Sequence, residues 1–207
     1  MAEEIKPTRS ELIKLKNRIK LVKAGYNLLK KKRDGLILEF FEILKESKEK
    51  AATLHESYSR AQHKLNMARI LQSDLAIKAA SFAVGKVPAI EVTQKNIVGV
   101  RVPRIKGESV RKKFFERGYS LYEPVAIDEA ADAYEKLVEE IIAVAEIEIT
   151  LRKLLAEIEK TKRRVNALEF EVIPSLEKMK NLISFRLEEM ERENFTRLKL
   201  IKARLQG

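Results

Sequence analysis

Two long stretches of this sequence contain neither glycine nor proline, and this absence constrains the fold more than any other feature. They are residues 36–84 and 125–173. Glycine and proline are the residues that most often end a helix, so stretches of this length without them favour long helices over a loop-rich fold. Charged residues make up 35% of the 207 residues and aromatic residues only 6%, a composition typical of coiled coils.

The first stretch belongs to a helix that we expect to begin at Thr8, where Thr8 and Glu11 have the spacing of a capping box. Gly85 and Pro88 predict its end. Apolar residues recur along it at alternating steps of three and four, the spacing of a coiled-coil seam.

The seam of the first helix needs one adjustment. Continued unchanged beyond Phe40, it would contain Ser47 and Lys50, whereas an insertion of four residues, a stutter, moves it to Leu44 and Ala51. The predicted seam residues are Leu12, Leu15, Ile19, Val22, Tyr26, Leu29, Leu36, Phe40, Leu44, Ala51, Leu54, Tyr58, Ala61, Leu65, Ala68 and Leu75.

The second long helix is expected to start at Asp128, because Glu129 and Asp132 add acidic side chains to its first turn. Pro174 lies inside it and costs about 3 kcal/mol in a helix interior. Since the apolar spacing continues on both sides of Pro174, we expect a kink there. The predicted seam residues are Leu137, Ile141, Val144, Leu151, Leu155, Ile158, Val165, Leu168, Val172, Leu176, Met179, Ile183, Leu187, Met190, Leu198, Ile201 and Leu205.

Single apolar stripes of this length need a partner stripe, and a connection of about forty residues favours an antiparallel pairing. We therefore predict a mainly α fold, a long antiparallel two-helix coiled coil with a small β-hairpin and a short loop or helix at the connection. The first helix would occupy residues 1–85, the hairpin and connecting segment 86–127 and the second helix 128–207, within one elongated domain.

The pairing brings the two basic ends of the chain together, because residues 1–35 lie beside 176–207. The first range has eleven basic and four acidic residues, and the second has eight and five. The net charge of the whole chain is +11, which indicates an acidic partner.

The connecting segment contains apolar residues that alternate with polar ones, as in a β-hairpin. The apolar residues are Ile90, Val92, Val98, Val100 and Val102, and Lys95 with Asn96 predicts the turn. A lone hairpin is marginally stable in water, so this one must dock on the helices or on a partner. The basic and aromatic stretch 106–122 does not predict a particular structure.

The sequence contains no pattern typical of catalysis, metal binding or cofactor binding. It has no cysteine, which excludes disulfides, thiolate metal sites and a cysteine nucleophile. His55 and His63 lack the spacing of a helical zinc motif, and Gly85-Lys86 lacks the rest of a phosphate-binding loop. We expect no catalytic residue, cofactor, metal or directly bound nucleotide. With no membrane-spanning run and no export signal, we also expect a soluble, intracellular chain.

The charged runs leave alternatives open. Carboxylate pairs such as Glu139-Glu140 and Glu188-Glu189 are interpreted as solvated helix faces rather than acid/base pairs. The basic runs 30–33 and 162–164 could be solvated faces, could meet an acidic protein surface or could contact nucleic acid. No recognised nucleic-acid-binding module is present, so the first two interpretations are favoured.

Five segments carry a resemblance to a known family. They are 7–12, 28–34, 96–103, 162–174 and 191–199, and the most specific is Lys-Arg-Arg-Val-Asn-Ala-Leu-Glu at 162–169. In these segments the chain resembles the D subunit of the archaeal A-type and vacuolar-type rotary ATPases. The resemblance implies a non-catalytic central shaft that couples ion flow through a membrane ring to ATP synthesis or hydrolysis by rotation.

The resemblance also implies partners and a location. The end with both termini would enter a hexamer of catalytic A and regulatory B subunits, the small F subunit of the stalk would bind the middle, and the far end would seat on the funnel-shaped C subunit above the membrane ring. The complex would lie at the cytoplasmic face of the cell membrane as a peripheral assembly, with no nucleic acid expected.

Two interfaces are expected on this basis. The hairpin residues Ile90, Val92, Val98, Val100 and Val102 would contact the F subunit or tune hydrolysis. The alternative function is a basic helical-hairpin scaffold or a nucleic-acid-binding protein. The residues expected to meet the catalytic ring are Arg9, Lys20, Lys23, Arg33, Arg192, Arg197 and Arg204.

Overall fold

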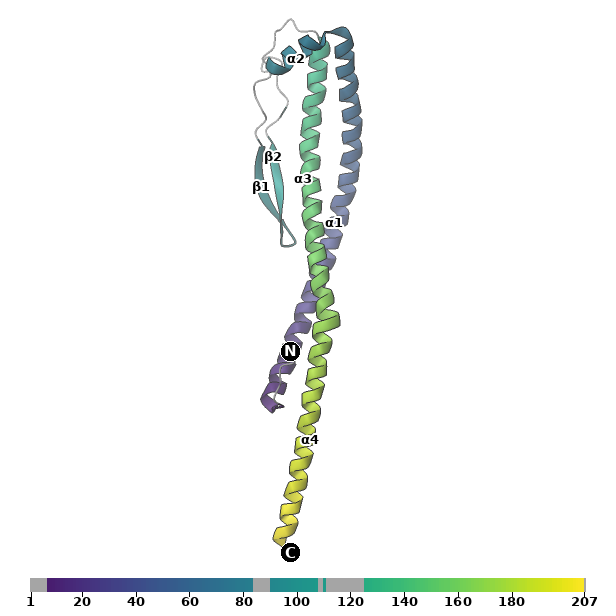
Figure 1. Ribbon diagram of the computed structural model, residues 1–207. Coiled ribbons are helices and arrows are strands. Elements are labelled where there is room, and N and C mark those ends of the chain that lie inside the picture. The colour runs from purple at the N-terminus through teal and green to yellow at the C-terminus, as the bar shows by residue number, and fades with distance from the viewer. Residues whose placement is uncertain (1–6, 84–89, 108–109, 111–124, 207) are drawn as a thin grey trace. The chain divides into compact units, whose positions relative to one another are not determined.

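A computed structural model describes residues 7–83, 90–107, 110 and 125–206 (Figure 1). The predicted helix end at Gly85 and Pro88 and most of the stretch 106–122 lie outside the described residues. The chain forms two compact units, which are described separately: unit 1 is 1–34 with 158–207, and unit 2 is 35–157.

The described elements confirm a mainly α fold with long antiparallel helices and one small antiparallel hairpin (Figure 1). In chain order they are α1 (Arg9–Leu71), α2 (Asp74–Ala83), β1 (Ile90–Ile97), β2 (Val100–Gly107), α3 (Val125–Ala167), the π-helical turn η2 (Leu168–Val172) and α4 (Ile173–Gln206).

In unit 1 the start of α1 lies antiparallel to α4. Arg9 pairs with Glu191 at 2.5 Å, and Lys23 pairs with Glu177 at 2.6 Å, so residue numbers rise along one helix as they fall along the other. The predicted pairing of 1–35 with 176–207 is therefore confirmed only as far as Glu191. The predicted seam residues beyond it, Leu198, Ile201 and Leu205, are exposed. The buried core consists of Leu15, Ile19, Leu176 and Ile183, with Leu12, Val22, Val172 and Leu187 packed against it.

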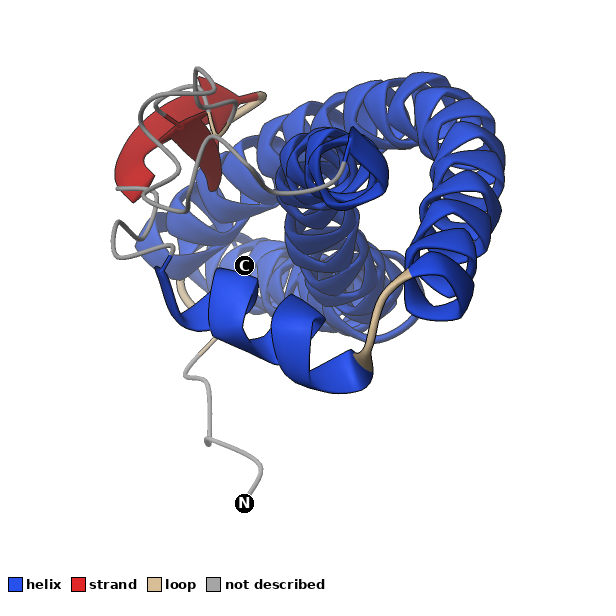
Figure 2. Cartoon of the chain, turned by 90° about the horizontal axis from the view of Figure 1, so that it is seen from above, coloured by secondary structure: helices blue, strands red, loops and turns tan. Residues whose placement is uncertain are grey.

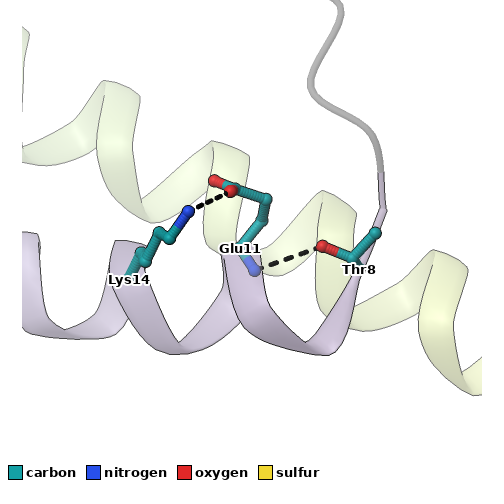
Figure 3. Close-up of polar contacts among 3 residues, drawn as sticks. All are labelled: Thr8, Glu11 and Lys14. Carbon is teal, nitrogen blue, oxygen red and sulfur yellow. Dashed lines mark hydrogen bonds and ion pairs between the residues drawn. The ribbon is translucent and has the colours of Figure 1, made fainter.

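The predicted cap at the start of α1 is present (Figure 3). The Thr8 hydroxyl oxygen accepts a hydrogen bond from the Glu11 backbone N–H at 3.2 Å, which satisfies one of the free donors of the first turn. The Glu11 carboxylate does not complete the box, because it accepts instead from the Lys14 ammonium at 2.8 Å.

The chain remains helical through Pro174, where we expected a kink. The five residues before Ile173 form a π turn, in which the Ile173 N–H donates to the carbonyl of Leu168. In a regular α-helix the proline ring would meet the carbonyl of residue 170, and the wider turn changes the bonding at that place. The sequence did not predict this turn.

In unit 2 the rest of α1 lies antiparallel to α3. The Tyr134 hydroxyl donates to the Gln62 side-chain oxygen at 3.1 Å, and Lys64 pairs with Glu129 at 3.5 Å. The start of α3 is Val125, before the predicted Asp128, and this first turn contributes the buried Ile127.

The predicted stutter in α1 is supported only in part. Ala51 and Tyr58 line a hollow together with Ile141 of α3, as the shifted seam requires. Ser47 and Lys50, which an uninterrupted seam would contain, are half-buried, whereas Ala51 itself is exposed. The face that α1 turns toward α3 is therefore wider here than one seam, and its half-buried positions tolerate a serine or the methylene stem of a lysine.

The predicted end of the first long helix also changes. The helix α1 ends at Leu71, and α2 follows as a separate short helix. Ser73 provides the break, because its hydroxyl oxygen accepts from the Ala76 N–H at 3.3 Å and caps a new helix start. Leu75, expected in the seam, is 78% exposed. Figure 2, which looks down on the molecule, shows α2 turned across the end of α1.

The hairpin is confirmed, but its turn is not at Lys95-Asn96. The strands pair from Ile90↔Gly107 to Ile97↔Val100, so Val98 and Gly99 form the turn. Both residues have positive φ, 48° and 81°, which is typical of the type I′ turns that fit the twist of a hairpin. The alternating pattern favours a strand through Gly99, and a β-branched residue such as Val98 rarely adopts a positive φ, so the sequence points away from this turn.

Candidate functional site

The hairpin and the segment that follows it are fixed to α3 by three side chains that lie seven residues apart along the helix. The Glu139 and Glu146 carboxylates accept hydrogen bonds from the backbone N–H groups of Val110 and Ile105, each at 3.1 Å. The Lys153 ammonium donates to the backbone carbonyl of Arg101 at 3.4 Å. Seven residues are two helical turns, so all three side chains lie on one face of α3, where two hold β2 and Glu139 holds the segment after it.

Burial follows the same face. On α3, Ile147, Thr150 and Leu154 are buried, and on β2 Val102 is 2% exposed. The predicted seam residues Ile141 and Leu155 are instead 46% and 47% exposed. The prediction failed here because α3 packs against the hairpin as well as α1, so its apolar face is not a single two-helix seam.

The five predicted hairpin residues divide into two groups. Val102 is buried and Val100 is half-buried, whereas Ile90, Val92 and Val98 are 51%, 61% and 41% exposed. At the tip, the Val98 side chain lies 3.9 Å from the position that a Cβ on Gly35 of α1 would occupy. The hairpin therefore docks through β2 and its tip, and leaves β1 exposed.

The interpretation of Glu139-Glu140 as a solvated pair is wrong. Glu139 bonds to the segment after β2, and Glu140 has a carboxylate oxygen that is inaccessible to solvent and finds no hydrogen-bond partner among the described residues. The sequence contained a signal for the docking residues in the seven-residue spacing of Glu139, Glu146 and Lys153. That spacing could not be recognised as a contact without knowing that a strand lies along α3.

The seven basic residues predicted to meet a catalytic ring all lie in unit 1. Four already form ion pairs within the chain: Arg9 with Glu191, Lys23 with Glu177, Arg33 with Asp34 and Arg197 with Glu193. Lys23 lowers the pKa of the Glu177 carboxyl by hydrogen bonding and by its charge. Lys20, Arg192 and Arg204 are exposed, and their side chains form no ion pair with any residue that the structure describes. These three are the better candidates for contacts with another chain.

The end of α4 is exposed over its whole circumference. Arg9, the first residue of α1, pairs with Glu191, so residues 192–206 continue beyond the start of α1 (Figure 1). Every residue from 188 to 206 is exposed. The large apolar side chains that are more than half exposed there are Phe195, Leu198, Leu200, Ile201 and Leu205.

Unit 2 has hollows between its helices. One hollow, of about 290 Å³, lies between α1, α2 and α3. Its lining is apolar and includes Leu65, Ile77 and Ile127. His55 lines another, of about 310 Å³, with Tyr58 and Ile141. Over the described ranges, no group of three or more metal-ligating side chains occurs. None of the helices described is both long and apolar enough to cross a membrane.

Paired long helices, a docked hairpin and an exposed apolar helix end define a coiled-coil protein with surfaces for other chains. Comparison with known proteins specifies which kind. The family model for the ATP synthase D subunit matches residues 11–203. The A-type ATP synthase D subunit of Methanosarcina acetivorans is 53% identical over 206 residues, covering 99% of each chain. That of Methanococcoides burtonii is 54% identical over 202 residues, covering 97% of this chain and 98% of the relative. The corresponding protein of Archaeoglobus fulgidus is 50% identical, covering 96% of each chain. This chain belongs to the family of ATP synthase D subunits.

Proposed function

We propose that this chain is the non-catalytic central rotor shaft of an A-type ATP synthase. In this role it transmits rotation between a membrane ring and a hexamer of A and B subunits, at the cytoplasmic face of the membrane. Its other partners are the F subunit, near the hairpin, and the C subunit. As a member of a family of ATP synthase subunits, it works as one part of a larger enzyme complex.

The observation that carries the proposal is the exposed end of α4. Isolated exposed apolar residues are normal on a protein surface, but five large ones within eleven residues of one helix favour a partner that covers them. Basic side chains surround them, including Arg192 and Arg204. A binding surface that is apolar at its centre and acidic at its rim would fit this helix end. A ring of subunits around a shaft could provide such a surface.

Rotation can be tested directly because the chain contains no cysteine. A single cysteine at the exposed Lys48 would attach a bead to the chain within a complex whose A and B subunits are immobilised. We expect the bead to turn in one direction when ATP is added. ATP hydrolysis at the normal rate with a stationary bead would contradict the shaft function.

The basic end can be tested by reversing charge. Replacing Lys20, Arg192 and Arg204 by Glu should weaken assembly with the A and B subunits, most at low salt, because screening reduces such attractions. The matched control reverses Lys45, Lys48 and Lys78, which are exposed in unit 2. Equal assembly of both variants would refute this interface. Binding of the unchanged chain to DNA or RNA, with steep salt dependence, would instead favour the nucleic-acid alternative.

The hairpin contact with the F subunit needs its own test. Replacing residues 90–107 by a short flexible linker should change the affinity for the F subunit or the ATPase rate. Helical circular dichroism should remain, since the long helices lie outside the deleted range. An unchanged rate together with unchanged binding of the F subunit would remove this role.

A further inference from the structure

The two outer edges of the hairpin differ in their hydrogen bonding. The backbone groups on the outer edge of β2 bond to side chains of α3. In an antiparallel pair, the backbone groups of alternate residues point toward the partner strand or away from it. The Ile105 N–H and the Arg101 carbonyl both bond to side chains of α3, so these two residues point away from β1. Pro103, which has no N–H, lies between them at a position with the same outward direction, so its ring removes no bond between the strands.

The same alternation fixes the free edge of β1. Asn96, Gln94 and Val92 face Arg101, Pro103 and Ile105 in the register, and Ile90 follows in the same series. Their N–H and carbonyl groups therefore point away from β2. No hydrogen bond from these outward groups occurs among the residues that the structure describes. In Figure 1, β2 lies between β1 and α3, so this edge is on the outer side of the hairpin.

An exposed edge of this kind is a template for another strand. The strand β1 has eight residues, about 26 Å at 3.3 Å per residue, and the apolar side chains of Ile90 and Val92 are exposed beside it. Natural proteins usually protect such edges, and the described part of this chain protects only the β2 edge.

The charge of the hairpin indicates what binds there. Four of its exposed side chains are basic and one is acidic: Lys95, Arg101, Arg104, Lys106 and Glu91. Two hairpins from two copies of this chain would bring like charges together, which disfavours pairing between copies. An acidic strand would bring opposite charges together.

We infer that the outer edge of β1 binds an extended acidic segment of another ATP synthase subunit as a third strand of the hairpin sheet. This inference rests on the proposed function, since it assigns a binding mode to the hairpin of the shaft. The backbone of Val92, Gln94 and Asn96 provides the hydrogen bonds, and the basic side chains select an acidic segment.

A proline at an outward position of β1 tests this mode. Gln94→Pro removes one outward N–H and blocks strand addition but leaves the bonds to β2, as Pro103 does on the facing strand. Gln94→Ala changes the side chain and keeps the N–H. Since prolines at facing positions could disturb the hairpin, Asn96→Pro serves as a second variant. Slow amide exchange at Thr93 and Lys95, whose N–H groups point toward β2, verifies that the hairpin is folded.

The measurement is the affinity of each full-length variant for an ATP synthase complex assembled without this chain. We expect the proline variants to bind about 5- to 150-fold more weakly, because each leaves a carbonyl of the added strand without its hydrogen bond. Gln94→Ala should bind as the unchanged chain does, because it keeps the N–H. In the complete complex, the Val92, Gln94 and Asn96 amides should exchange at least tenfold more slowly than in the free chain.

The outcomes separate the inference from the proposed function. Equal affinity of a folded proline variant, or equal weakening by Gln94→Ala, would overturn strand addition. Dimerisation of the free chain that Gln94→Pro abolishes, without any effect on assembly, would also overturn it by showing a second copy as the occupant. If the unchanged chain failed to join the complex at all, the proposed function itself would fail.

Discussion

Replacing Glu146 by Ala should loosen the hairpin from α3. The Glu146 carboxylate accepts the N–H of Ile105 at 3.1 Å in a part-buried setting. Hydrogen bonds to charged groups contribute about 1.5–3 kcal/mol, because the remaining partner loses its bond without recovering full hydration. The equilibrium for local opening of the strand should therefore rise about 10- to 150-fold.

The assay is amide hydrogen exchange of the full-length chain at neutral pH, read at Ile105. Its exchange rate should rise by the same factor, whereas core amides of unit 1 near Ile183 should be unchanged. Glu148→Ala is the matched control, since Glu148 is on the same helix and forms an exposed pair with Arg152 at 2.5 Å. Such surface pairs contribute about 0.3–0.5 kcal/mol, so exchange at Ile105 should change less than about threefold. Equal effects of the two substitutions would refute the argument that Glu146 fixes the strand.

Three further changes test the fold. Leu154→Ala should cost about 2–5 kcal/mol in urea unfolding, because Leu154 is fully buried, whereas Leu155→Ala should cost much less; equal costs would contradict the observed face of α3. Thr8→Ala should remove about 1 kcal/mol of helix stability, because the cap at the start of α1 is lost. The loss is measured as increased amide exchange in the first turn of α1. Unchanged exchange would show that the cap contributes nothing. The pKa of Glu177 is lowered in the folded chain. Its pair with Lys23 therefore stabilises the fold at pH values above the ordinary pKa of 4.5, and this stabilisation is lost as the pH falls through the lowered pKa. Lys23→Gln should reduce the acid sensitivity of unfolding, and an identical pH profile for the variant would contradict this assignment.

The sequence was sufficient to predict the long helices, the start of α1 and the pairing of the two ends of the chain. The alternation of apolar residues predicted long antiparallel helices, and the cap at Thr8 predicted where α1 begins. The antiparallel pairing in unit 1 followed from the apolar stripes together with the long connection between the helices, and Leu15 and Ile183 share its core.

The failures occurred where a third element intervenes. The seam of α3 could not be predicted near Leu154 because the hairpin packs against that face, and a period of 3.5 residues assumes a single partner. The turn at Val98-Gly99 was missed because a β-branched residue there is unfavourable locally, and only the complete register shows it. The sequence also did not reveal the contacts of Glu139 and Glu146, since an acidic residue on a helix has the same pattern whether it meets water or a strand.

The pair between Arg9 and Glu191 has a consequence for how this chain can evolve. All the buried residues that the structure describes in unit 1 precede Glu191, so the last turns of α4 contribute nothing to this core. Mutations in these last turns do not affect the packing of the core, so selection acts on them only through the contacts that this helix end makes with other chains. Substitutions in this terminal stretch can therefore alter a contact with another chain without unfolding the core of unit 1.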